Sequence, residues 1–263
     1  MLQPAPTVVV GVDGSKTATD AARWAVDEAM SRDIPLRLVY VVAPPDSPPR
    51  WAHDGRLAAA RAVLHDARRA VEATGQQVKI EAEILWGSPL AKLAEESRSA
   101  AMICVGSIGL SHAARGVGSL SATLAASALC PVAVISRPSG RPATAKLDRV
   151  IVQADNTVAL RHAFEEATLR HAPVLAIAVA AGDDDADTKS SAAAQLRRRI
   201  ARWTHLYPEV RVESAVVRGS VEQYLAADGE RDQLFVTDAR ACYDVCGAHH
   251  PGTSVLAARS SNL

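Results

Sequence analysis

The chain lacks a net charge, a long apolar run and a disulfide framework, and it is poor in aromatic residues. Its 29 basic and 29 acidic residues cancel, so it has no overall field that would attract nucleic acid or a membrane surface. No stretch approaches the roughly 20 apolar residues of a membrane-spanning helix, and residues 1–7 lack the pattern of a leader peptide. Its 4 cysteines are too few for a disulfide scaffold. We therefore expect a cytoplasmic protein that binds neither nucleic acid nor membranes.

Two catalytic motifs are also missing. There is no Gly-x-x-x-x-Gly-Lys-Ser/Thr sequence, which argues against a P-loop ATPase. There is no Gly-x-Ser-x-Gly nucleophile elbow and no evident general base, so fast catalysis is not expected. Cys242 and Cys246, followed by His249 and His250, match no established zinc spacing, and we predict no metal site there.

The first half alternates apolar, β-branched segments with helical patterns. The strand-like segments are 8–12, 36–42, 78–85, 101–106 and 131–135. The helical patterns cover 16–32, 56–73, 90–97 and 119–129. Such alternation predicts a Rossmann-like α/β fold with an open parallel sheet. Asp13 and Gly106 end the first and fourth strands, and placing these strands side by side at the switch point gives the order 3-2-1-4-5.

The second half repeats this pattern. Residues 150–157 copy residues 8–15, and Gly219-Ser220 copies Gly87-Ser88. We therefore predict two domains of the same fold, 1–138 and 148–263. The segment 139–147, rich in Pro, Gly and Thr, would link them.

The second copy is expected to be degenerate. Gly11, Gly14 and Gly106 of the first copy are replaced by Gln153, Asn156 and Thr237. After Gly252-Thr253 the chain runs almost at once into the apolar segment Val255-Leu256-Ala257-Ala258, so the fourth helix is expected to be missing. We therefore place nucleotide binding in the first copy alone.

A glycine-bearing loop follows the fourth strand of the first copy. Gly106 and Gly109 precede Gly118-Ser119, where the fourth helix is expected to begin, and free N–H groups and the helix dipole favour an anion there. Asp13 before Gly14 is by itself a turn and helix-cap signal. Paired with the loop at the switch point, Asp13 is predicted to contact a ligand.

These motifs resemble those of a known family. Val-Gly-Val-Asp-Gly-Ser at 10–15, followed by Gly-x-x-Gly at 106–109 and Gly-Ser at 118–119, is similar to the universal stress protein family. Tandem pairing of two such domains is known in that family, and one branch binds ATP.

The resemblance implies a set of binding residues. Asp13 would contact the ribose or phosphate region, and Val41 would meet adenine through its backbone. The ribose and phosphates would be wrapped by Gly106, Gly109, Gly118 and Ser119, with Leu120 beside them.

Two functions remain at this point. The first is a stress-response protein whose N-terminal domain binds ATP, with magnesium left open, and whose association with an unidentified protein partner responds to the nucleotide. The second is a scaffold without nucleotide binding, since the segment 110–117 is one residue shorter than in the family's ATP-binding pattern. Slow hydrolysis and self-phosphorylation at Ser119 or Ser121 are further hypotheses. So is a homodimer through an exposed final strand, either 131–135 or its equivalent in the second copy.

Overall fold

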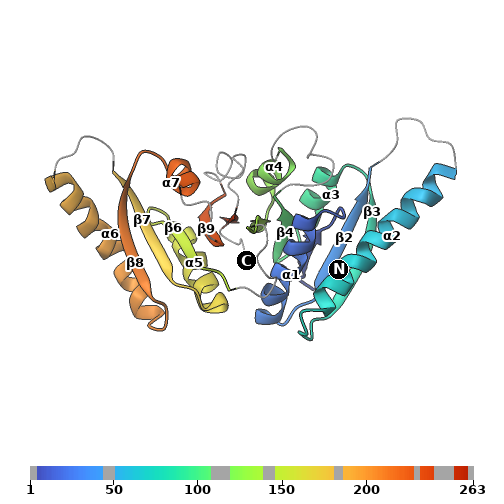
Figure 1. Ribbon diagram of the computed structural model, residues 1–263, viewed down its shortest axis with the longest axis horizontal. Helices are drawn as coiled ribbons and strands as arrows, with labels where there is room; N and C mark the ends of the chain where they lie inside the picture. The colour runs from blue at the N-terminus through green and yellow to red at the C-terminus, as the bar shows by residue number, and fades with distance from the viewer. Residues whose placement is uncertain are drawn as a thin grey trace. The chain divides into compact units, whose positions relative to one another are not determined.

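The chain forms two compact units, Met1–Ser136 and Arg137–Leu263 (Figure 1). This computed structural model describes residues 5–43, 51–107, 119–138, 146–180, 186–227, 232–239 and 252–259. Each unit is an α/β structure built on a parallel sheet, which confirms the predicted fold class. No helix of the described part is long and apolar enough to span a membrane.

The first unit alternates strands and helices along the chain. Its elements are β1 (Val8–Gly11), α1 (Lys16–Ser31), β2 (Leu36–Val42), α2 (Trp51–Glu72), β3 (Ile80–Trp86), α3 (Pro89–Glu96), β4 (Met102–Gly106), α4 (Ser119–Ser127) and β5 (Val132–Ile135). Parallel pairing gives the strand order β3-β2-β1-β4-β5. Helices α1 and α2 pack together on one face of the sheet, and α3 packs against α4 on the other.

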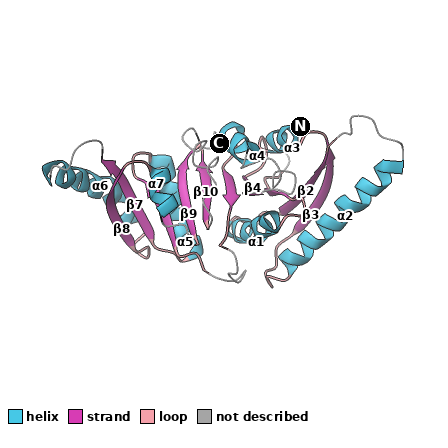
Figure 2. Ribbon diagram, turned by 45° about the horizontal axis from the view of Figure 1, so that its top comes forward, coloured by secondary structure: helices cyan, strands magenta, loops and turns pink. Residues whose placement is uncertain are grey.

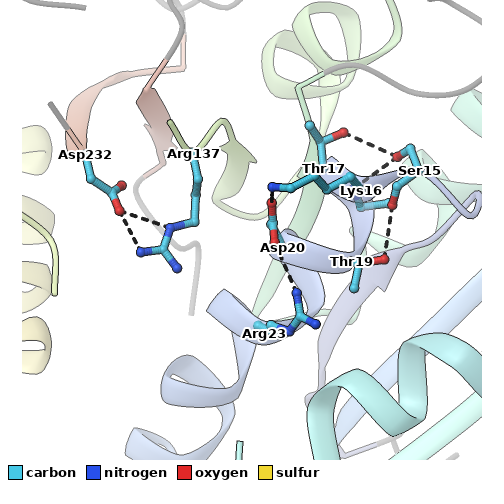
Figure 3. A network of polar contacts seen from close by, with 9 residues as sticks. Ser15, Lys16, Thr17, Thr19, Asp20, Arg23, Arg137 and Asp232 are labelled. Atoms are coloured by element: carbon cyan, nitrogen blue, oxygen red, sulfur yellow. Dashed lines mark hydrogen bonds and ion pairs between the residues drawn. The ribbon is translucent and has the colours of Figure 1, made fainter. Parts of the chain in front are cut away.

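Burial and capping explain why α1 forms next to β1. Val8, Val9 and Val10 are completely buried, as expected of a parallel strand that is covered on both faces. The predicted alanine stripe of α1 lies flat on the sheet and is almost fully buried, at Ala18, Ala22, Ala25 and Ala29. Ser15 caps the helix, because its Oγ accepts a hydrogen bond from the Ala18 N–H at 3.1 Å. Figure 3 shows this first turn.

The second unit has the same succession of strands. Its elements are β6 (Arg149–Gln153), α5 (Thr157–Arg170), β7 (Val174–Ala180), α6 (Ala186–Leu206), β8 (Val212–Arg218), α7 (Val221–Ala227), β9 (Gln233–Asp238) and β10 (Thr253–Ala258). The strand order is β8-β7-β6-β9-β10 (Figure 2). The predicted loss of a fourth helix concerns residues 240–251, which lie outside the described residues. Cys242, Cys246, His249 and His250 lie there too.

The prediction of an exposed final strand is wrong. All four residues of β5 are buried, and so are all six residues of β10. The homodimer itself stays a prediction.

An aromatic cluster joins α5 to α6 in the second unit. The Phe164 ring lies 5.9 Å from the ring of Trp203 and 5.5 Å from that of Tyr207, measured between centroids. Burial raises the pKa of the Tyr207 hydroxyl above its ordinary value of 10.0, and the charge of Glu165 raises it further.

Candidate functional site

A cavity of about 500 Å³ opens at the carboxyl ends of β1, β2 and β4, where the strand order of the first unit reverses. This is the position at which open parallel sheets bind ligands. Ligand cavities in proteins measure about 300–1,000 Å³, so this cavity has room for a small molecule. Its lining comes from the strand ends and from helices on both faces of the sheet, and includes Asp13, Ser15, Val41, Arg56, Leu93 and Leu120.

Asp13 has the turn role that its sequence suggests, and it also lines the cavity. Its Oδ1 accepts a hydrogen bond from the Ser15 N–H at 2.9 Å, across Gly14, whose φ is 88°. A positive φ suits glycine, so the Asp-Gly-Ser sequence fits this turn. The turn holds the Asp13 carboxylate at the end of β1, beside the cavity.

The main chain of Val41 faces the cavity side of β2. The Val12 N–H donates to the Val39 oxygen at 2.9 Å, so the main-chain groups of Val39 point toward β1. Those of Val41 point the same way, because the direction alternates along a strand. The pairing with β1 ends at Gly11, opposite Val39. Within the described residues, no strand therefore pairs with the N–H and C=O of Val41 on that side.

Gly106 lines the cavity, but its missing side chain is explained by packing. A Cβ atom at Gly106 would lie 2.6 Å from the Ala18 nitrogen and 2.6 Å from Thr17 Oγ1. Real Cβ atoms essentially never show contacts that short. The first turn of α1 therefore passes directly against the end of β4. This close approach of α1 requires glycine at position 106 without any appeal to a ligand.

The fourth-strand loop is described only in part. Leu120, in the first turn of α4, lines the cavity together with Ser121. Ser119 starts α4, whereas Gly109 and Gly118 lie outside the described residues. Of the predicted residues, the structure therefore brings Asp13, Val41, Gly106 and Leu120 to one cavity.

Arg56 and Ser107 are two of the lining residues that were not identified as site residues from the sequence. Arg56, near the start of α2, donates from Nη1 to the Ala43 oxygen at 3.1 Å and lines the cavity at the end of β2. Ser107 follows Gly106, and its buried Oγ has no hydrogen-bond partner among the described residues. The sequence indicates the placement of Ser107 at the cavity only through its position directly after β4. Arg56 had no such signal, because folding alone brings α2 to the end of β2.

In the second unit, the corresponding strand end is held by its own polar contacts. Gln153 Nε2 donates to Asp155 at 2.9 Å, and Asn156 Nδ2 donates to Asp238 at 3.0 Å. From α6, Arg199 donates to the Ala154 oxygen at 3.2 Å. The residues that replace Gly11 and Gly14 are thus engaged with neighbours of the same unit. Among the described residues, no group of three His, Cys, Asp or Glu side chains could hold a metal ion.

Three known proteins illustrate what the chain is similar to. A universal stress protein of Mycobacterium tuberculosis is 56% identical over 265 residues, covering 99% of this chain and 98% of the relative. A crystal structure of a universal stress protein from Archaeoglobus fulgidus covers 97% of each chain, with a TM-score of 0.70 at 14% identity, and so shares the fold. A universal stress protein from Archaeoglobus fulgidus in complex with dAMP covers 50% of this chain and 97% of its own, with 22% identity and a TM-score of 0.39.

The family model named Universal stress protein family matches residues 5–136, which is nearly the whole first unit. A relative that is 56% identical over 99% of the chain supports the same assignment. The chain belongs to the universal stress protein family.

Proposed function

We propose that the first unit binds ATP in the cavity at the ends of β1, β2 and β4, and that the bound nucleotide changes the association of the protein with a partner. One observation carries the proposal. The main chain of Val41, with which no described strand pairs on the β1 side, and the carboxylate of Asp13 line the same cavity of about 500 Å³. These are the two kinds of group that recognise a base and a ribose.

The β2 end suits adenine. The N–H and C=O of Val41 form an adjacent donor and acceptor, and adenine offers the complementary acceptor and donor at its N1 and 6-amino groups. Guanine presents a donor and an acceptor in the reverse order at the same edge. Apolar side chains of Ala59 and Leu93 also line the cavity and suit the faces of a flat base.

The β1 end suits the ribose and phosphates. A carboxylate such as that of Asp13 is the usual acceptor for ribose hydroxyl groups at a switch point. The N-terminus of α4, at Ser119, carries the positive end of a helix dipole that favours phosphate. Arg56 adds a cation at the cavity. Magnesium, slow hydrolysis and self-phosphorylation at Ser119 or Ser121 stay predictions, as do the cytoplasmic location and the homodimer.

Calorimetry of the purified full-length chain with ATP tests the proposal. We expect a saturable titration with one site per chain. Asp13→Ala should weaken binding about tenfold to a hundredfold, because a hydrogen bond to a charged group contributes about 1.5–3 kcal/mol. The matched control is Asp155→Ala, at the equivalent position of the second unit, which should bind ATP like the wild type.

The alternative function is a scaffold that acts through protein contacts alone. It predicts no heat on adding ATP to the wild-type chain and no nucleotide carried through purification. A response of Asp155→Ala equal to that of Asp13→Ala would also argue against a site in the first unit.

A further inference from the structure

The first unit has an open sheet edge at β3. β3 pairs with β2 and, among the described residues, lies at the end of the strand order. The Leu36 N–H donates to the Lys79 oxygen at 2.9 Å, and the Gly87 N–H donates to the Val42 oxygen at 3.0 Å. Odd-numbered residues of this segment therefore turn their main-chain groups toward β2. The N–H and C=O groups of Ala82 and Ile84 consequently point away from the sheet, toward the open edge.

A groove runs beside this edge, between α2 and β3. It measures about 480 Å³ and is lined by Arg61, Leu64, His65 and Arg68 of α2 and by Ala82, Glu83 and Ile84 of β3. The α2 residues follow the three- and four-residue spacing of one helix face. Leu64 is buried at the base, Ile84 is half-buried, and Ala82 is exposed. The groove thus combines an apolar base with a free strand edge.

The groove is positively charged. Arg61 and Arg68 form no ion pair with any residue that the structure describes. The one carboxylate of the lining, Glu83, is engaged by Arg37 from β2. An occupant of matching charge must therefore bring carboxylates.

We propose that the β3 edge and this groove bind an extended acidic segment of a partner protein. The segment adds to the sheet as a further strand, with main-chain hydrogen bonds to Ala82 and Ile84. Its side chains on the α2 face place an apolar residue over Ile84 and carboxylates beside Arg61 and Arg68. A second copy of this chain is disfavoured as the occupant. If the β3 strands of two copies paired with both α2 helices on the same face, Arg61 and Arg68 of one copy would lie near the same arginines of the other, and their like charges would repel.

This inference goes beyond the proposed function and does not depend on nucleotide binding. The test therefore uses the full-length chain without nucleotide. The binding partner in the assay is the fluorescein-labelled heptapeptide Thr-Glu-Thr-Val-Thr-Glu-Thr, whose alternate residues present carboxylates on either side of valine on one face. Its counterpart Thr-Lys-Thr-Val-Thr-Lys-Thr has the same β propensity and the opposite charge. Fluorescence anisotropy follows both titrations.

We expect the acidic peptide to bind at least about tenfold more tightly than the basic one. The double variant with Arg61→Glu and Arg68→Glu should remove that preference. The matched control is Arg69→Glu, an exposed arginine of α2 outside the groove, which should leave the preference unchanged. Equal affinity for both peptides, no saturable binding of either, or an equal effect of Arg69→Glu would overturn the proposal.

A main-chain variant separates strand addition from simple charge attraction. Ala82→Pro removes the Ala82 N–H, which points to the open edge and forms no bond within the described sheet. Proline is tolerated at such edge positions. The thermal midpoint should therefore stay near that of the wild type while affinity for the acidic peptide falls at least about tenfold. Unchanged affinity in a folded Ala82→Pro variant would overturn strand addition.

Discussion

Adding one methyl group at Gly106 should destabilise the first unit far more than the same change elsewhere. In Gly106→Ala, the new Cβ would meet the Ala18 nitrogen and Thr17 Oγ1 at 2.6 Å and the Thr17 carbonyl carbon at 2.7 Å. Two of these three atoms belong to the backbone of α1 and cannot swing away. The first turn of α1 or the end of β4 must shift.

The expected loss of stability follows from the contacts that the new methyl group would make. Overpacking a well-packed site costs about 1–3 kcal/mol, and contact with backbone places Gly106→Ala at the upper end, about 3 kcal/mol. Gly11→Ala should cost less, since its Cβ would meet side-chain atoms of Leu93 and Val105 at 3.2 and 3.3 Å. Gly55 lies in helix α2, and a Cβ added there would have no atom within 4 Å. Gly55→Ala should therefore stabilise the protein by about 0.5–1 kcal/mol, since alanine is the better helix residue.

Thermal unfolding followed by circular dichroism measures the three variants. For chains of this size, about 1 kcal/mol moves the midpoint by about 2–4 °C, so Gly106→Ala should lower it by about 6–12 °C. Gly55→Ala should raise it by a few degrees. A Gly106→Ala midpoint equal to that of the wild type would refute the close approach of α1 to β4. So would a destabilisation of Gly55→Ala as large as that of Gly106→Ala.

Three further predictions concern the second unit. Asn156→Ala should lower stability by about 1 kcal/mol in urea unfolding, because the Asn156 side chain caps α5 by accepting from the Val158 and Ala159 N–H groups. Arg137→Ala should cost about 3 kcal/mol in the same assay, and Arg137→Lys less, because Arg137 donates to the buried Asp232 from Nε at 3.0 Å and from Nη2 at 2.6 Å (Figure 3). Tyr207→Phe should remove from an absorbance titration of tyrosinate a component whose pKa lies above 10.0, since burial raises the Tyr207 pKa. The stability that Tyr207 contributes should be complete below pH 10.0 and lost as the pH rises through its folded pKa.

Much of the fold could be predicted because its signals are local. The run Val8-Val9-Val10 predicts a buried parallel strand, and Ser15 before the alanine stripe predicts a capped helix. The start of α2 was missed by five positions, 56 against Trp51, since Gly55 lies inside this helix and is an unfavourable helix residue.

The candidate site was predicted less completely, because its remaining features depend on tertiary contacts. The packing role of Gly106 requires the first turn of α1, which lies about ninety positions earlier in the chain. Arg56 reaches the end of β2 only after folding. The burial of β5 and β10 likewise depends on what covers these strands, which the strand sequences do not state.

The most direct test of the proposed nucleotide site is a crystal structure of the full-length chain grown with saturating ATP. The account predicts the nucleotide in the cavity of the first unit, with the adenine edge hydrogen-bonded to the Val41 main chain and a ribose hydroxyl donating to Asp13. An ordered nucleotide in the second unit, or a first-unit cavity filled by solvent alone at saturating ATP, would contradict it.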